Sequence, residues 1–200
     1  KYLGKKPEEL KIVTCHLGNG SSISAVDGGK CVDTSMGFTP LAGVMMGTRS
    51  GDIDASAVEF LARKKGLSHA EVVTYLNKKC GVAGISGDFR DLIAGAKKGN
   101  ERCALALDMF AYQTKKFVGA YTAAMGGLDC IVFTAGIGEN PPTVREDVCT
   151  GLEFLGVKFN ARANKAKNDG SIREISKSNS KVKDLIIPTN EELVIARETA

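Results

Sequence analysis

An apolar stretch with no polar side, DCIVFT at residues 129–134, is the feature that most limits how this chain can fold. A β-strand turns alternate side chains to opposite faces, so an uninterrupted apolar run is buried on both of them. Such burial is typical of a parallel strand between helices. VKDLIIP, at residues 182–188, is interpreted as a second buried strand. The two stretches predict an α/β domain.

The first part of the chain predicts an antiparallel part of the same sheet. Residues 11–17 are a short β-rich run, and residues 21–27 alternate polar and apolar side chains. Residues 30–35 follow Gly28-Gly29, which is a two-residue hairpin signal. Three strands in a meander and two buried strands together give a mixed sheet of five strands.

Helix signals occupy most of the remaining sequence. Asp52 or Asp54 caps the first helix, and Ser68 with Glu71 forms a capping box for the second. Helices are expected over about 52–64, 69–79, 89–97, 101–125 and 141–152, with a terminal helix after residue 189, whereas the polar residues 157–180 predict a loop.

The longest predicted helix, 101–125, is expected to lie in the core and to end at Gly126-Gly127. Its apolar residues recur near helical spacing. The residues that define this face are Leu105, Met109, Tyr112, Phe117 and Tyr121.

Composition excludes several classes of protein. The chain has 200 residues, of which 43% are hydrophobic and 25% charged, and its formal net charge is +4. These values are ordinary for a globular protein, and the mixed charges predict a solvated surface rather than a nucleic-acid interface. The six cysteines show neither a CxxC pair nor zinc spacing, which favours reduced, buried thiols in the cytoplasm. No apolar run approaches the length of a membrane span, and no signal peptide is visible.

Two glycine-rich turns, HLGNG at 16–20 and AGIGEN at 135–140, follow predicted strands. Glycines let the backbone approach a ligand so that N–H groups point at phosphate oxygens. The alternatives are a plain Asn-Gly hairpin for the first turn and, for the second, a strand-to-helix turn with Asn140 as N-cap and Pro141 as the first helical residue. The second turn does not fit GxGxxG, because Pro141 stands where the last glycine is needed, and the chain also lacks a Walker A motif and GxSxG.

A long glycine-rich loop, 36–52, contains Arg49 among apolar residues. A guanidinium there needs an anion, because burying it unpaired is costly. The simplest partner is Asp52 or Asp54, and the alternative is a phosphoryl group.

A second charged segment is GDFRD at 87–91. Asp88 predicts a helix cap with an internal ion pair to Arg90. Alternatively, Phe89 and Arg90 sandwich a flat ring, because both side chains stack.

Taken together, these segments resemble the acetokinase family, the kinases of acetate, propionate and butyrate in the sugar kinase/Hsp70/actin superfamily. The resemblance spans essentially the whole chain. It implies a ribonuclease-H-like (actin-like ATPase) α/β domain with a mixed five-stranded sheet flanked by helices. Residues 1–200 would be the C-terminal nucleotide-binding domain, with the N-terminal domain absent. The motifs that carry the resemblance are HLGNGSS, DTSMGFTPLAGVMMGTRSGDID, GISGDFRD, FTAGIGEN, GLEFLGV and IPTNEELVIARET.

The resemblance also implies a role for individual residues. Arg49 would stabilise the transition state, Asn19 would contact the transferred phosphoryl group with Ser21 close by, and Pro40 would line the acyl pocket. Glu191 would bind Mg²⁺, and a capping box between Thr189 and Glu192 would leave it free to do so. The residues implied to bind ATP or ADP are His16, Leu17, Gly18, Asn19 and Gly20 for the phosphates, Asp88, Phe89 and Arg90 for adenosine, and Gly136, Ile137, Gly138, Glu139 and Asn140 for the rest of the pocket.

The implied reaction is reversible phosphoryl transfer from ATP to a short-chain carboxylate, giving acetyl phosphate and ADP from acetate. The chain would supply the nucleotide half, be inactive alone, and form a homodimer through this domain. Propionate or butyrate as acceptor stays open. Two other classes of protein also stay open, an actin/Hsp70-type nucleotide switch and a sugar kinase. Arg49 in an apolar loop distinguishes the phosphotransferase from the switch.

Overall fold

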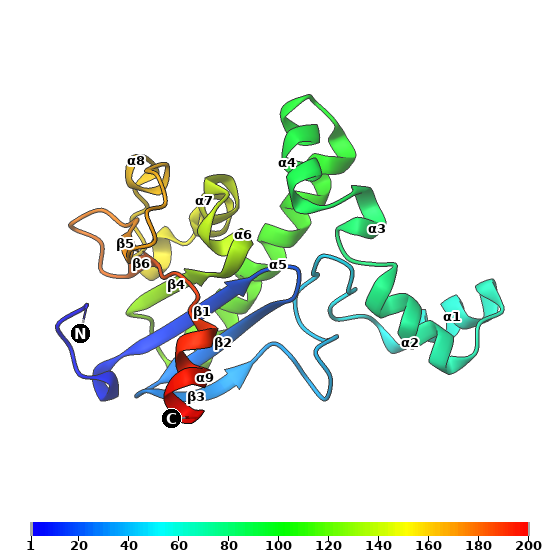
Figure 1. The fold of residues 1–200 in the computed structure, drawn as a ribbon, viewed down its shortest axis with the longest axis horizontal. Coiled ribbons are helices and arrows are strands. Elements are labelled where there is room, and N and C mark those ends of the chain that lie inside the picture. The colour runs from blue at the N-terminus through cyan, green and yellow to red at the C-terminus, as the bar shows by residue number, and fades with distance from the viewer. Residues whose placement is uncertain (1, 200) are drawn as a thin grey trace.

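The computed structural model describes residues 2–199, and within that range the side chains of all residues except 191, 194, 195 and 198. A mixed sheet with the strand order β3-β2-β1-β4-β6-β5 forms its centre (Figure 1). The strands are β1 (Lys11–Leu17), β2 (Ser21–Asp27), β3 (Lys30–Thr34), β4 (Cys130–Thr134), β5 (Arg173–Glu174) and β6 (Lys183–Ile186).

The predicted meander is confirmed. β1 pairs antiparallel with β2 from Lys11↔Asp27 to Leu17↔Ser21, and β2 pairs antiparallel with β3. Alternate side chains of β1 are buried at Val13, Cys15 and Leu17. One face of the meander therefore belongs to the core, as the alternation along 21–27 predicts.

The two buried strands are also confirmed, and both are parallel to β1. β4 lies between β1 and β6, and its residues from Cys130 to Phe133 are buried. The α/β class with a mixed sheet is therefore correct.

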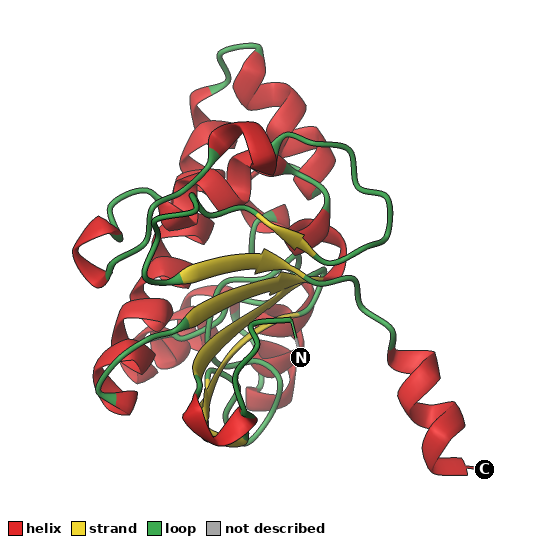
Figure 2. Ribbon diagram, turned by 90° about the vertical axis from the view of Figure 1, so that its left-hand side faces the viewer, coloured by secondary structure: helices red, strands yellow, loops and turns green. Residues whose placement is uncertain are grey.

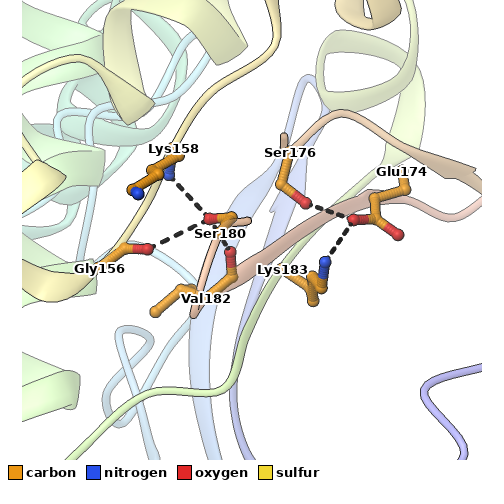
Figure 3. A network of polar contacts seen from close by, with 7 residues as sticks. All are labelled: Gly156, Lys158, Glu174, Ser176, Ser180, Val182 and Lys183. Atoms are coloured by element: carbon orange, nitrogen blue, oxygen red, sulfur yellow. Dashed lines mark hydrogen bonds and ion pairs between the residues drawn. The ribbon is translucent and has the colours of Figure 1, made fainter. Parts of the chain in front are cut away.

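The predicted number of strands is wrong by one. The polar stretch 157–180, expected to be a loop, contains β5, which pairs antiparallel with β6 and makes the sheet six-stranded. Side-chain hydrogen bonds fix this edge: Glu174 Oε1 accepts from Lys183 Nζ at 2.9 Å and from Ser176 Oγ at 2.7 Å (Figure 3). Next to them, Ser180 Oγ accepts from the backbone N–H of Lys158 at 2.8 Å. The edge strand is held by polar bonds, so hydrophobic periodicity does not reveal it.

The predicted helices form close to their expected bounds. Asp54 caps the first by accepting from Ser56 N, and Ser68 with Glu71 forms the predicted capping box on the second. The helices are η1 (Pro7–Glu9), α1 (Ala55–Lys65), α2 (His69–Lys78), α3 (Ala83–Ser86), α4 (Phe89–Lys97), α5 (Glu101–Met125), α6 (Ala135–Glu139), α7 (Pro142–Cys149), η2 (Glu153–Leu155), α8 (Ala161–Asn164) and α9 (Glu191–Thr199).

The long helix α5 covers one face of the sheet, and its buried face matches the predicted one only in part. Tyr121 is buried and Phe117 packs against the core, as predicted. Leu105, Met109 and Tyr112 are 54%, 37% and 64% exposed. The core side also contains Phe110, and it includes Thr114 and Thr122, whose hydroxyls donate to carbonyls one turn earlier in α5. Because these hydroxyls are satisfied within the helix, the threonines pack as small apolar residues, and selecting only large apolar side chains omits them from the face.

The opposite face of the sheet has a small apolar cluster of its own, formed by Cys130, Val132 and Leu185 with Leu3, Ile12 and Ile187. Figure 2 shows α9 standing away from the sheet at the end of a loop. None of the helices within residues 2–199 is long and apolar enough to cross a membrane.

All six cysteines are free. Cys15, Cys103, Cys130 and Cys149 are buried, as expected, but Cys31 is exposed. Burial raises the pKa of the Cys130 thiol to about 12. Burial also raises the pKa of the Cys15 and Cys149 thiols, so these three thiols are neutral packing groups rather than nucleophiles.

Candidate functional site

The two glycine-rich segments meet at one edge of the sheet. β1 and β4 are parallel neighbours, with His16 opposite Thr134, so the residues that follow both strands emerge side by side. A Cβ on Gly18 would lie 3.7 Å from the Cβ of Ala135. The carboxyl ends of parallel strands are the usual place for ligands in open α/β sheets.

The HLGNG turn is a hairpin that also packs against the long loop 36–52. Gly18 N donates to Gly20 O at 3.0 Å, and Ser21 Oγ donates to Gly18 O at 3.1 Å. Across the turn, Gly47 N donates to Asn19 O at 3.0 Å. A Cβ on Gly47 would overlap the amide oxygen of Asn19, so only glycine at 47 leaves room for that side chain.

AGIGE forms a one-turn helix, α6, and this overturns the expected turn. Asn140 is the C-cap of α6 rather than the N-cap of the next helix, and its Nδ2 donates to Gly136 O at 2.9 Å. Pro141 is the N-cap of α7 rather than its first residue, so α7 begins one residue later than predicted. Ala135 starts α6 with φ +65°, the only positive value of a non-glycine residue in the described chain. Strained backbone of this kind persists only where surrounding contacts hold it.

Thr189 holds the start of α6. Its hydroxyl accepts from Ala135 N at 2.9 Å and lies 2.7 Å from the hydroxyl of Thr134. Its own N–H donates to Glu139 Oε1 at 2.9 Å. The loop before α9 is thereby tied to both ends of α6.

The predicted capping box at α9 is wrong. Thr189 bonds to α6 instead, and Asn190 caps α9 by accepting from Leu193 N at 3.1 Å. The side chain of Glu191, the predicted magnesium ligand, lies outside the described residues. Glu192 lines a cavity together with His16, Glu139 and Asn190.

Arg49 extends over the HLGNG turn. Its Nη1 donates to Pro40 O at 3.2 Å and contacts Met46 Sδ at 3.5 Å, and it would lie 3.3 Å from a Cβ on Gly20. Neither predicted carboxylate partner pairs with it, because Asp52 accepts from Gly43 N and Asp54 from Ser56 N. Among the described residues Arg49 forms no ion pair. A half-buried guanidinium without a carboxylate thus lies against the glycine turn.

The GDFRD segment begins α4 and forms the predicted cap and ion pair. Hydrogen bonds from the N–H groups of Asp91 and Arg90 hold the pKa of Asp88 below its usual value. Arg90 Nη2 lies 3.3 Å from Asp88 Oδ2, with its side chain exposed. The ring of Phe89 is buried edge-on against Phe110, with centroids 4.8 Å apart. Stacking of a base between Phe89 and Arg90 stays a prediction.

Three neighbouring cavities of about 630, 510 and 380 Å³ bring most of the predicted site residues together. Asn19 lines both the 630 and the 380 Å³ cavity, and His16 lines both the 510 and the 380 Å³ cavity. Gly136 lines both the 630 and the 510 Å³ cavity. The predicted residues that line them are His16, Gly18, Asn19, Gly20, Ser21, Asp88, Phe89, Arg90, Gly136, Ile137, Glu139 and Asn140.

Some predicted residues do not line these cavities, and Arg49 is one of them. Leu17 is fully buried in the core, and Gly138 packs against the ends of β1 and β4. Pro40 contributes its carbonyl to Arg49. Its neighbours Thr39 and Leu41 line a separate cavity of about 270 Å³.

The prediction also missed residues that line the largest cavity, namely Gly47, Thr48, Ala83, Ile93 and Pro141. Gly47 and Thr48 immediately precede Arg49, so the glycine in this segment was the available signal. Ala83 and Ile93 are ordinary helical residues, and no local pattern marks them.

The described side chains hold no group of three His, Cys, Asp or Glu residues able to bind a metal ion alone. Glu139 and Glu192 lie on one cavity with His16. Magnesium is usually held by one or two carboxylates plus substrate phosphates, so this oxygen-rich edge fits a nucleotide-bound Mg²⁺ better than a dedicated metal cage.

A model of the acetokinase family matches residues 1–197. The chain belongs to the acetokinase family. It is 56% identical over 200 residues to acetate kinase of Heliobacterium modesticaldum, an alignment that covers 98% of this chain and 50% of that protein. The chain therefore spans about half the length of the curated relatives it matches.

Solved acetokinase-family structures share this fold. Acetate kinase from Porphyromonas gingivalis matches 99% of the chain with a TM-score of 0.94 and 48% identity, over 50% of its own length. A propionate kinase from Francisella tularensis matches 94% of the chain with a TM-score of 0.86 and 41% identity, over 48% of its length. The fold is thus the expected actin-like ATPase class, with six strands instead of five.

Proposed function

We propose that this chain is the nucleotide-binding half, residues 1–200, of an ATP-dependent kinase that phosphorylates a short-chain carboxylate. Acetate and ATP would give acetyl phosphate and ADP, reversibly. The observation that carries the proposal is the position of Arg49. This guanidinium, which has no carboxylate partner among the described residues, would lie 3.3 Å from a Cβ on Gly20, and Gly20 is in the turn that lines one of the cavities. The relatives named acetate kinase, which are twice as long, support it.

The proposed mechanism requires positioning and positive charge rather than covalent chemistry. Phosphoryl transfer spreads charge over three equatorial oxygens, and donors around them lower the barrier. The HLGNG turn and the α6 segment would bind the phosphates, and Asn19 would contact the transferred group. Arg49 would meet the charge that develops in transit, because its planar fork matches phosphoryl oxygens.

No general base is needed, because a carboxylate nucleophile has no proton to lose. We assign His16, on the shared cavity wall, the role of a hydrogen-bond donor to phosphate. Glu191, with Glu192 beside it, would hold Mg²⁺, which neutralises phosphate charge when bound.

The acceptor is proposed to be acetate, with propionate or butyrate as the alternative. Pro40, whose carbonyl accepts from Arg49, would line the acyl pocket. The similarity to a propionate kinase keeps the alternative open. Most of the pocket would come from the half of the relatives that this chain does not match.

We further propose a cytoplasmic homodimer that forms through this domain. Leu105, Met109 and Tyr112 follow one another along one face of α5 and are exposed, which suits a symmetric helix contact. The free, largely buried cysteines fit a reducing compartment.

Trapping of acyl phosphate tests the reaction. The full-length enzyme that contains these residues would be mixed with MgATP and acetate, propionate or glycerol, with hydroxylamine present. Hydroxamate formed from acetate supports the proposal, and a faster rate with propionate would reassign the acceptor. ATP hydrolysis without hydroxamate would instead indicate a nucleotide switch, and phosphorylated glycerol a sugar kinase.

A further inference from the structure

The helix α6 ends in a way that leaves two of its carbonyls, those of Ile137 and Gly138, without helical donors. An α-helical carbonyl accepts from the N–H four residues later. For Ile137 and Gly138 those residues are Pro141 and Pro142, which have no N–H. The last carbonyls of α6 therefore require a donor from elsewhere in the protein.

Arg145 of α7 supplies that donor. Its Nη1 donates to Gly138 O at 2.7 Å, and its Nε donates to Asn164 Oδ1 at 2.7 Å. A third bond joins Nη2 to Asn164 O at 3.2 Å. Asn164 is fixed in turn, because its Nδ2 donates to Pro142 O at 2.8 Å. The guanidinium thus ties α6, α7 and α8 together, and these three helices lie next to one another in Figure 1.

Arg145 is only 1% exposed, and no acidic side chain in the described part of the chain pairs with it. Burial lowers the pKa of this guanidinium to about 10, and nearby Arg173 contributes to the decrease. Leucine or methionine would fill such a place at lower cost if packing were all that was needed. A buried charge whose hydrogen bonds join a carbonyl of α6 to Asn164 of α8 indicates a demand on the position of α6 relative to its neighbours.

The position of Gly138 matters because both neighbouring stretches of α6 form cavity walls. Gly136, Ile137 and Asn140 line the largest cavity, and Glu139 lines the second. Gly138 itself packs against the ends of β4 and β1, because a Cβ there would lie 3.4 Å from the carbonyl carbon of Phe133 and 3.5 Å from Cys15 O. A shift of Gly138 would move both walls.

We propose that Arg145 is a positioning residue for nucleotide binding, which holds α6 in its binding geometry through the carbonyl of Gly138. The inference rests on the proposed function, because it assigns α6 to the nucleotide site. Arg145 itself would not contact the nucleotide.

The test measures MgADP affinity by isothermal titration and amide hydrogen exchange at residues 136–140, both on the 200-residue chain. Arg145→Met keeps most of the side chain's volume but loses its donors. We expect it to weaken MgADP binding at least tenfold and to speed exchange in this segment. Val148→Ala is the matched control, because Val148 is fully buried in the same helix but does not contact α6 through hydrogen bonds. It should lower thermal stability and leave affinity within twofold.

The outcomes separate the inference from the proposed function. Equal affinity and exchange in Arg145→Met and Val148→Ala would overturn the inference. If the unaltered chain bound no MgADP, the proposed function would fail, and hydrogen exchange would still decide whether Arg145 holds α6. Should Arg145→Met not fold, Arg145→Lys replaces it. The lysine ammonium can reach Gly138 O but cannot also span Asn164, so we expect MgADP to bind about threefold more weakly to this variant. An MgADP affinity equal to that of Val148→Ala would refute the inference.

Discussion

Asp184 gives a sharp prediction about stability and pH. This residue of β6 is fully buried, and neither carboxylate oxygen has a hydrogen-bond partner among the described residues. Burial, with a smaller contribution from Glu174, raises the pKa of Asp184 from 3.8 to about 7, and Lys183 partly opposes this. The other titratable groups whose pKa values it influences are the thiols of Cys15, Cys130 and Cys149.

The sign of the effect follows from where each state loses its proton. Below about pH 4 the Asp184 carboxyl is protonated in both the folded and the unfolded chain, so it carries no pH-dependent penalty. Between pH 4 and 7 the unfolded chain ionises first, and the free energy of unfolding falls as the pH rises. At about 1.36 kcal/mol per pKa unit, the penalty reaches roughly 4 kcal/mol above pH 7.

The assay compares urea unfolding of the chain and of Asp184→Asn between pH 4.5 and 8. Asparagine is nearly isosteric and never ionises, so the other titrations cancel in the difference between the two proteins. We expect Asp184→Asn to gain stability relative to the unaltered chain as the pH rises, by about 3 kcal/mol over this range, with a plateau above pH 7. A difference that stays constant from pH 4.5 to 8 would refute the argument that Asp184 is buried as a neutral acid.

Three further predictions concern the site and the surface. In the full-length enzyme, Arg49→Ala should lower kcat by about 10³ or more and change ATP affinity far less, and Arg49→Lys should restore little of the loss. A higher KM for ATP with unchanged kcat would show that Arg49 does not stabilise the transition state. Ala135→Gly should raise the free energy of unfolding by about 0.5–1 kcal/mol, because glycine adopts φ +65° without strain. The control Ala104→Gly in α5 should lower the free energy of unfolding by about 1 kcal/mol. A lower free energy of unfolding in both variants would show that Ala135 is unstrained. Light scattering of the chain should give a dimer mass, and Leu105→Lys with Tyr112→Lys should give a monomer, whereas a monomeric unaltered chain at high concentration would contradict the proposed interface.

Local sequence patterns predicted most of the secondary structure. The bounds of β1 and β2, the capping box at Ser68 and the helix 101–125 were readable because each depends on neighbours in sequence. The family resemblance implied that the two glycine segments share one pocket, and the structure brings them together because β1 and β4 are parallel neighbours.

Tertiary contacts decided what the sequence did not reveal. AGIGE looks like a turn, but Thr189 at its start and Arg145 at its end stabilise a one-turn helix. Thr189 was expected to cap α9 and instead bonds to α6, which lies 50 or more residues away in sequence. One of the two partners considered for Arg49 was a nearby aspartate, yet both candidate aspartates accept from backbone N–H groups instead. Each error assigned a local partner to a side chain that has a distant one.

The location of nucleotide binding is the most direct test of the account. The ¹⁵N-labelled 200-residue chain would be titrated with MgADP and followed by amide NMR. We predict weak, saturable binding, with the largest shifts at residues 16–20, 47–49, 88–90 and 135–140 and with α1 and α2 unaffected. Saturable shifts confined to another surface, or no binding at millimolar MgADP, would contradict the assignment of these segments to one nucleotide site.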